Sequence, residues 1–162
     1  MATRSTIALE YADGTVEQVY CHWDGYLDNN GRILLEHWSD PTKLQQLIDL
    51  GDLSSLGPNI GDKHEFSCPY EYNTLEAQEW RAKYQEVCTF YGRDRGEDGV
   101  EKRKYENYQQ YLKTGQQEEY NYILRQIDGG AVWLVASYKT NDRFVKLETA
   151  IAEEIKENEE VE

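Results

Sequence analysis

Apolar and polar residues alternate with the two-residue period of a β-strand in two parts of the chain. Residues 5–23, STIALEYADGTVEQVYCHW, contain two such runs on either side of Asp13-Gly14, a pair that favours a tight hairpin turn. Residues 119–138 contain two more runs, which a DGG turn signal separates. The alternation therefore predicts two β-hairpins, and we expect them to pair in one antiparallel sheet.

Other segments repeat their apolar residues with the period of an α-helix. The clearest is 41–50, which follows the N-cap residue Asp40, begins with Pro41 and ends before Gly51. The other predicted helices are 31–38, 74–88, 101–113 and a last one from about Lys146. The end of the third helix is left open, because VCTFY at 87–91 has the composition of a strand.

Loops and the two ends of the chain complete the expected organisation. The Gly- and Pro-rich residues 51–70 and the charged segment GRDRGEDG are predicted as loops. The sum is an α+β fold in which helices pack on the sheet formed by the two hairpins. A length of 162 residues indicates a single globular domain, for which we expect the bounds 1–152. Residues 153–162 contain six Glu, which oppose the helix macrodipole, so an acidic and frayed tail is predicted.

The charge balance excludes several classes of partner. The chain carries a formal net charge of −14, whereas nucleic-acid phosphates and anionic membranes both attract Lys and Arg. Direct nucleic-acid or membrane binding is therefore not expected, and the favoured partners are proteins with basic faces or a ligand in a local basic pocket. Thirteen Tyr and four Trp indicate a folded chain, because disordered acidic chains are poor in aromatic residues. Oligomerisation is left open.

Cysteine and histidine spacing predicts neither a metal site nor a cofactor. Cys21, Cys68 and Cys88 form no CxxC pair, so they are expected to be reduced thiols packed as small apolar residues. His22, His37 and His64 share no ligand spacing. The sequence begins without a long apolar run, so we expect neither a signal peptide nor a membrane span, and a cytoplasmic location.

The segment YCHWDGY at 20–26 is the first candidate site. His22 and Asp24 could act as a general acid–base pair, or His22, Trp23, Asp24 and Tyr26 could contact a ligand. The third interpretation is structural: the end of a strand, followed by a turn in which Asp24 bonds the backbone. Strand alternation places His22 and Trp23 on opposite faces, so the segment is expected to form one wall of a pocket at most.

The segment YGRDRGED at 91–98 is the second candidate site. Arg93 and Arg95 could bind a phosphate or carboxylate bidentately, with Asp94 beside them and Tyr91 stacking on a planar group. The alternative is a solvated loop whose charges pair with one another, which requires no function. We expect ligand binding where this segment and YCHWDGY form the two walls of one pocket.

Four motifs occur in a fixed order: YCHWDGY, GRILLEHW, LIDLGDLSSLG and YGRDRGED. In this respect the chain resembles a group of small acidic proteins encoded by tailed bacteriophages and prophages. The resemblance covers about the first 61 residues and residues 89–98. It implies a viral origin and the cytoplasm of a bacterial host, and it lends no catalytic residues. By analogy, small phage accessory proteins of this size modulate host enzymes or blunt host defence.

Three functions follow as hypotheses. The preferred one is a non-enzymatic binding protein that counters a host defence component, by binding a host protein or by sequestering a nucleotide signal. The second is an acidic mimic of nucleic acid that inhibits a host DNA-binding protein. The third is a small nucleotide hydrolase using His22 and Asp24. Whether the protein is an enzyme stays open, although the sequence contains no nucleophile elbow and no catalytic residue is assigned.

Overall fold

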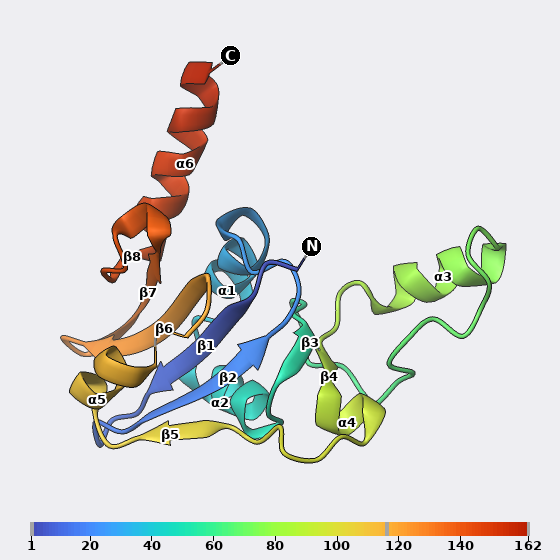
Figure 1. Ribbon diagram of the computed structural model, residues 1–162, viewed down its shortest axis with the longest axis horizontal. Helices are drawn as coiled ribbons and strands as arrows, with labels where there is room; N and C mark the ends of the chain where they lie inside the picture. Colours follow the sequence, from blue (N-terminus) through green and yellow to red (C-terminus); the bar gives the residue numbers. More distant parts are fainter. Residues whose placement is uncertain (1, 116, 162) are drawn as a thin grey trace.

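The computed structural model, which describes residues 2–115 and 117–161, has an α+β fold centred on one eight-stranded sheet (Figure 1). The strands are β1 (Ser5–Glu10), β2 (Val16–Cys21), β3 (Leu53–Ser55), β4 (Thr89–Phe90), β5 (Arg103–Tyr105), β6 (Tyr120–Ile127), β7 (Gly130–Ser137) and β8 (Val145–Lys146). Their order is β4-β3-β2-β1-β6-β7-β8, and β5 pairs with β2 beside this path. Both predicted hairpins are confirmed, as β1–β2 and β6–β7.

The prediction of an antiparallel sheet is only partly correct, because the sheet is mixed. The two hairpins join through β1 and β6, which run parallel from the pair Ser5–Tyr120 to the pair Leu9–Leu124. β2 and β3 are also parallel. A short turn forces the strands on either side of it to run in opposite directions. A long connection, such as that between β2 and β6, imposes no direction, so the alternation could not reveal the parallel joints.

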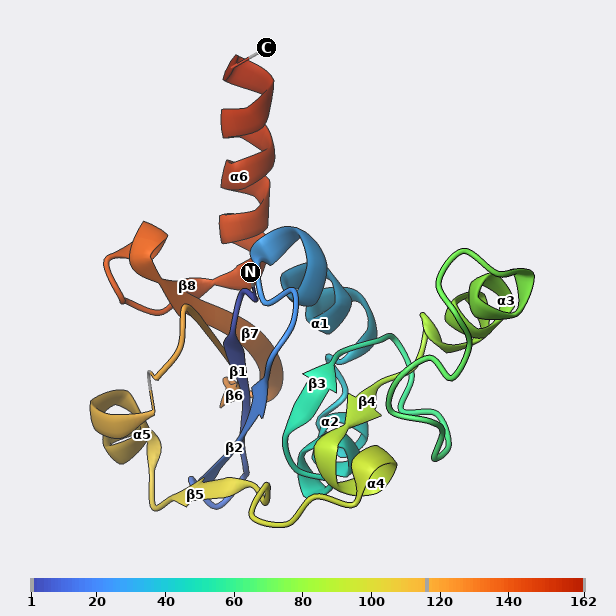
Figure 2. The same ribbon diagram turned by 45° about the vertical axis from the view of Figure 1, so that its right-hand side comes forward.

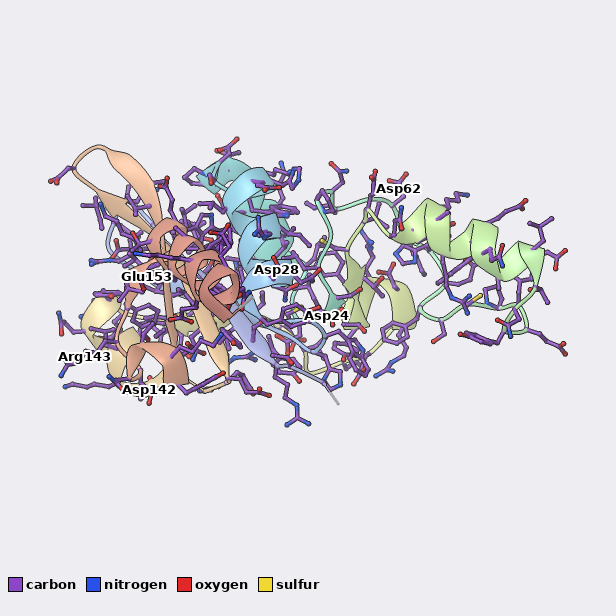
Figure 3. All side chains as sticks on the ribbon, turned by 90° about the horizontal axis from the view of Figure 1, so that it is seen from above. Asp24, Asp28, Asp62, Asp142, Arg143 and Glu153 are labelled. Carbon is purple, nitrogen blue, oxygen red and sulfur yellow. The ribbon has the colours of Figure 1, made fainter. Side chains whose placement is uncertain are left out.

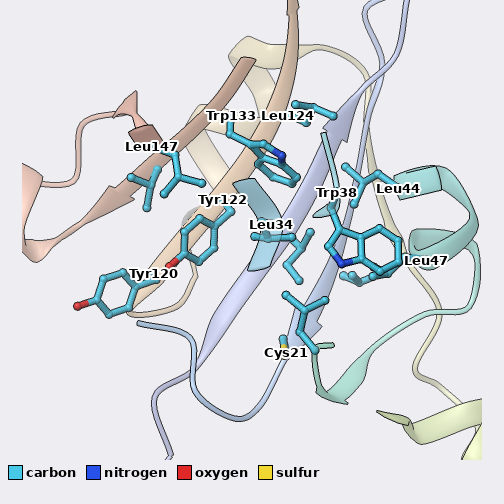
Figure 4. Packing of buried hydrophobic residues seen from close by; sticks show 14 of the residues in the cluster. Cys21, Leu34, Trp38, Leu44, Leu47, Tyr120, Tyr122, Leu124, Trp133 and Leu147 are labelled. Atoms are coloured by element: carbon cyan, nitrogen blue, oxygen red, sulfur yellow. The ribbon is translucent and has the colours of Figure 1, made fainter. Parts of the chain in front are cut away.

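Helices cover the sheet mainly on one face. They are α1 (Arg32–His37), α2 (Pro41–Asp49), α3 (Leu75–Tyr84), α4 (Tyr91–Arg95), α5 (Tyr108–Thr114) and α6 (Leu147–Val161), with a π-helical turn η1 (Leu27–Gly31) and a 3-10 turn η2 (Tyr138–Thr140). The main core holds α1, α2 and α6 against the sheet, with Leu147 near Tyr122 and Leu47 beside Trp38 (Figure 4). A smaller core on the opposite face contains Tyr111 of α5. The amphipathic pattern thus placed α2 and α6 correctly.

Tertiary pairing replaces the helix expected at 101–113. Its first part is β5, whose Tyr105 hydroxyl donates to Gln18 Oε1 (2.9 Å). Asn107 then caps α5, since its side chain accepts from the Gln110 N–H. Tyr105 and Tyr111 pack together in the smaller core. Tyrosines spaced three apart fit one helix face equally well, and pairing with β2 decided the outcome.

Two other expected loops contain regular structure. The Gly- and Pro-rich segment holds β3, and the first half of GRDRGEDG lies in α4, with Asp94 buried. The first hairpin turn is also longer than a two-residue turn, because the strand pairing ends at Glu10–Val16 and Tyr11 N–H bonds the Thr15 carbonyl (2.8 Å). Local composition marked these segments as breaks, but it could not reveal the partners that order them.

The C-terminal half of α6 projects away from the sheet (Figure 2). The first turns of α6 carry Leu147 and Ile151 into the main core, whereas Ile155, further along the helix, is 40% exposed. Residues 153–161 continue the helix, so this part of the predicted tail is helical in the structure. Residue 162 lies outside the described residues, and the domain bounds 1–152 stay a prediction.

Gly51→Ala should destabilise the fold more than Gly14→Ala. Both glycines have positive φ, +86° and +91°, which costs an alanine about 1–2 kcal/mol. At Gly51 a Cβ would also lie 2.4 Å from the Val100 carbonyl oxygen, whereas at Gly14 no atom lies within 4 Å. We expect losses in the free energy of unfolding of about 2–3 and about 1 kcal/mol, measured by urea denaturation. Equal losses would show that the contact with Val100 is unimportant.

Candidate functional site

An arm (residues 62–86) extends from the β4 end of the sheet and carries α3 (Figures 1 and 2). α3 begins at its N-cap Thr74, whose hydroxyl accepts from Ala77 N–H (3.2 Å). Ala77 is the buried residue of α3, so most of the surface of this helix is open to solvent. The joint between the arm and the sheet is where aromatic and polar side chains from distant segments meet.

Asp94 and Arg93 hold this joint together. The Asp94 carboxylate accepts from Phe90 N–H (2.8 Å), from His64 N–H (3.1 Å) and from Arg93 Nε (3.0 Å). Arg93 also donates to the carbonyl oxygens of Ile60 (3.1 Å), Gly61 (2.7 Å) and Cys88 (3.0 Å). The guanidinium N–H groups are thus engaged by the chain itself. This arrangement differs from the solvated loop expected, because residues 60–64 fold back against α4.

Burial raises the pKa of the Asp94 carboxyl, but the hydrogen bonds from Arg93, Phe90 and His64 outweigh this effect and hold the pKa below its ordinary value. His64 lies beside Asp94, with Nε2 3.2 Å from the Cys88 carbonyl oxygen and Nδ1 2.8 Å from the Glu65 carbonyl oxygen. Its ring stacks on Tyr84 at 4.6 Å. These contacts fix the base of the arm.

An open groove of about 310 Å³ lies between the arm and the sheet. We call it the arm groove; it is lined by Ser54, Ser55, Phe66, Trp80, Arg81, Tyr84, Gln85 and Thr89. The rings of Trp80 and Tyr84 are 5.0 Å apart, and the stack of His64 under Tyr84 restrains them. Aromatic faces, hydroxyls, an amide and one guanidinium therefore surround a single open space.

A second aromatic group borders this groove. Phe66 and Tyr91 are 5.5 Å apart, and the Arg95 guanidinium lies over both rings, at 4.4 Å and 4.9 Å. Arg95 also pairs with Glu97. Burial raises the pKa of Tyr91, and its hydrogen bond with the Ser54 side chain opposes that shift. Tyr91 and Arg95 thus come close to the arm groove through Phe66 and Ser54.

The YCHWDGY segment continues β2 along β3. His22 N–H and Trp23 N–H donate to the carbonyl oxygens of Leu53 (3.1 Å) and Ser54 (3.0 Å). The hydrogen bond of the His22 ring is with the Tyr20 hydroxyl (2.7 Å from Nδ1). Figure 3 labels Asp24 in the turn after β2, Asp28 in η1 and Glu153 in α6. Among the described residues, no hydrogen bond joins His22 to Asp24, the residue with which the hydrolase hypothesis pairs it.

A tight turn follows at Asp24-Gly25. Asp24 has φ +56°, and its carbonyl oxygen accepts from Asn30 N–H (3.2 Å). A Cβ at Gly25 would lie 2.7 Å from the Ser5 Cβ, so the close approach requires glycine. Tyr26 leads into η1 and, like Trp23, is partly exposed.

The two predicted segments lie on either side of β3 and leave it in opposite directions, because β2 runs parallel and β4 antiparallel to β3. Tyr91 N–H bonds the Asp52 carbonyl (3.2 Å), as Trp23 N–H bonds that of Ser54 (3.0 Å). The arm groove is lined, however, by other residues of β3, β4 and the arm. Ligand binding by His22, Trp23, Asp24, Tyr26, Tyr91, Arg93, Asp94 and Arg95 stays a prediction.

Sequence reasoning missed Phe66, Arg81 and Ser54 as site residues. Trp80 and Tyr84 were not among the candidate site residues either. The signal that could have identified them is the lack of an apolar stripe in 75–84, because its apolar residues are spread around the helix and leave no face to bury. An exposed helix that nevertheless carries Trp and Tyr indicates a surface for binding.

Cysteine and metal chemistry is not prominent in the part of the chain described. Cys21 and Cys88 are free and buried in the main core, as expected, and burial raises the pKa of both thiols to about 12. Within residues 2–115 and 117–161, no three His, Cys, Asp or Glu side chains are grouped to hold a metal ion. In the same residues, no helix is long and apolar enough to cross a membrane.

Comparison of the chain with protein-family models, with curated proteins and with solved structures finds no match in any of the three.

Proposed function

We propose that this is a small, non-enzymatic binding protein that holds a planar, anionic ligand of the nucleotide class in the arm groove. The observation that supports the proposal most directly is the meeting of Phe66, Trp80 and Tyr84 with Arg81 around one open space of about 310 Å³. Aromatic faces stack on nucleobases of any sequence, and a guanidinium pairs with phosphate. Hydroxyls of Ser54 and Thr89 supply directional hydrogen bonds.

Local charge also supports this ligand class. The chain as a whole is strongly acidic, yet Arg81 lines the arm groove, and Arg95, which pairs with Glu97, lies beside it. Arg81 forms no ion pair among the described residues; its guanidinium lies over the Tyr72 ring at 5.1 Å. It is therefore available to a phosphate, unlike Arg93, whose donors are engaged by Asp94 and by backbone carbonyls.

The resemblance to small phage and prophage proteins extends the proposal to a biological role. In that role the ligand is a nucleotide signal of bacterial defence, and the protein sequesters it in the cytoplasm of the host. A role against host defence through a host protein remains the alternative form of the same proposal. Both forms rest on the resemblance, whereas the ligand class rests on the groove.

Trp80→Ala should weaken nucleotide binding about tenfold or more, because base stacking on an aromatic ring is worth about 1–3 kcal/mol. Isothermal titration with a panel of linear and cyclic nucleotides is the measurement. Arg81→Gln should weaken binding less at high salt than at low salt, since it removes a screened charge interaction. Leu75→Ala is the matched control, because Leu75 is an exposed residue of the same helix outside the groove.

Two results would contradict the proposal. One is the absence of heat for every nucleotide tested, and the other is equal affinity in the Trp80→Ala and Leu75→Ala variants. Chromatography of the nucleotides after incubation separates binding from hydrolysis. Turnover that is lost in His22→Ala would replace this proposal with the hydrolase hypothesis.

A further inference from the structure

A second hollow lies at the base of α6. This helix stands away from the arm (Figure 2). It encloses about 270 Å³ between α6, the β7–η2–β8 segment and η1. We call it the α6 groove; its lining is Leu27, Val135, Ser137, Lys139, Thr140, Val145, Thr149, Ala150, Glu153, Glu154 and Glu157. The arm groove and the α6 groove share no residue.

Short side chains on one side of α6 leave this space open. Leu147 and Ile151 point into the main core and anchor the helix. The groove is lined on the helix side by the short side chain of Ala150, which is 8% exposed, and on β7 by Val135, which is fully buried. The result is an apolar floor, and Val145 at its edge is 36% exposed.

Carboxylates dominate the rim. Glu153, Glu154 and Glu157 line the α6 side, and Lys139 is the cation opposite. Lys139 Nζ bonds Glu154 Oε2 (2.8 Å), and this hydrogen bond raises the pKa of Lys139, so the pair is internally neutral. Glu153 and Glu157 form no ion pair among the described residues. The rim therefore carries two uncompensated negative charges.

The same two residues are unfavourable for α6 by itself. Glu153 and Glu157 are four residues apart, where like charges repel along a helix. Glu157 also lies in the C-terminal half of the helix, toward the end where the helix dipole is negative. A cationic group bound at the rim would remove both penalties, so the helix gains stability from a partner of opposite charge. Figure 3, which looks down on α6, shows Glu153 on this projecting helix.

We propose that the α6 groove docks an amphipathic, basic helix of a partner protein. An apolar side chain of that helix enters the groove and contacts Ala150 and Val145, and its Lys or Arg residues pair with Glu153 and Glu157. The apolar floor with a charged rim matches the way amphipathic helices enter grooves, with apolar anchors and flanking charges. A space of this size receives a few side chains from a helix rather than the body of a folded domain. The site is independent of the arm groove.

The test uses the full-length protein and a fluorescein-labelled synthetic helix with leucines on one face and lysines on the other. Fluorescence polarisation should show binding at moderate ionic strength. A Glu153→Gln/Glu157→Gln variant should bind about tenfold more weakly, since each exposed ion pair is worth up to about 1 kcal/mol. Thr149→Trp, a substitution at an exposed position that fills the groove, should weaken binding without changing the thermal midpoint of unfolding.

The matched control is Glu76→Gln/Glu79→Gln, which removes the same charge from exposed positions on α3. Equal weakening by both double variants would mean that the peptide reads only net charge, and it would overturn the proposal. So would equal binding of a leucine–glutamate helix or of a lysine–glutamine helix. Sedimentation of the protein alone identifies the competing occupant: a dimer that Thr149→Trp dissociates would assign the groove to a second copy of the chain. None of these outcomes bears on nucleotide binding at the arm groove.

Discussion

Replacing Asp94 with alanine is expected to lower the free energy of unfolding by about 3–5 kcal/mol, the usual cost of removing one partner from a buried ion pair. The carboxylate is fully buried, and it accepts from Phe90 N–H (2.8 Å), His64 N–H (3.1 Å) and the Arg93 guanidinium (3.0 Å). Alanine leaves all of these donors without an acceptor. Because His64 lies at the base of the arm, the arm should also become more sensitive to limited proteolysis.

The effect should depend on pH in a defined direction. The folded pKa of Asp94 lies below its unfolded value of about 3.9, so its contribution is fully present above that value. It is lost as the pH falls through the folded pKa. Urea denaturation should therefore show a large difference between the wild type and Asp94→Ala at pH 7, and a smaller one in acid. Asp98→Ala, at an exposed position of the same segment, is the control.

A loss below about 1 kcal/mol for Asp94→Ala, or a loss equal to that of Asp98→Ala, would contradict the structural role. The carboxylate would then be free to meet a ligand, as the sequence-based hypothesis has it. Nucleotide affinity should be measured at temperatures where the Asp94→Ala variant is folded. If stability falls by the expected amount but this affinity is unchanged, the joint stabilises the fold without contributing to binding in the arm groove.

The burial of Asp94 in the structure illustrates what the sequence could and could not predict about the site. RDR in a Gly-flanked segment has the composition of a solvated loop, and nothing nearby in sequence indicates burial. The His64 N–H that bonds Asp94, and the carbonyl oxygens of residues 60–61 that accept from Arg93, are far away along the chain. Local sequence patterns carry information about residues that are close in the chain. The cluster of Asp94, Arg93 and His64 instead depends on where the Gly- and Pro-rich segment folds back against α4.

The fold shows the same division. The hairpin around Asp128-Gly129 was predictable, because both residues adopt positive φ, +49° and +80°, as such a turn requires. The N-cap at Asp40, which accepts from Thr42 N–H (2.9 Å), was equally predictable, because Asp is a favoured N-cap residue. β3 was not, since its backbone is ordered by pairing with β2 and β4 rather than by its own composition.

Trp38→Ala should cost about 3–5 kcal/mol, the range for removing a large buried aromatic side chain. Trp38 is fully buried in the main core at the end of α1, and its Nε1–H donates to the Gly57 carbonyl (2.9 Å). Lys43 Nζ lies 4.2 Å from the ring centroid and donates to the Pro58 carbonyl (2.9 Å). One side chain thus ties α1, α2 and the segment after β3 together.

Two further variants separate the causes of that loss. Trp38→Phe keeps an aromatic ring but removes the indole donor, so it should cost about 1–3 kcal/mol, the penalty for a buried carbonyl left without its partner. Trp23→Ala, at a residue that is 44% exposed, should change stability by less than about 1 kcal/mol. Guanidinium denaturation followed by circular dichroism measures all three. If Trp38→Ala and Trp23→Ala proved equally mild, the main core would not depend on Trp38. Because the segment that Trp38 holds leads directly into residues 60–64, a large loss would also show that the core positions the joint on which the arm groove depends.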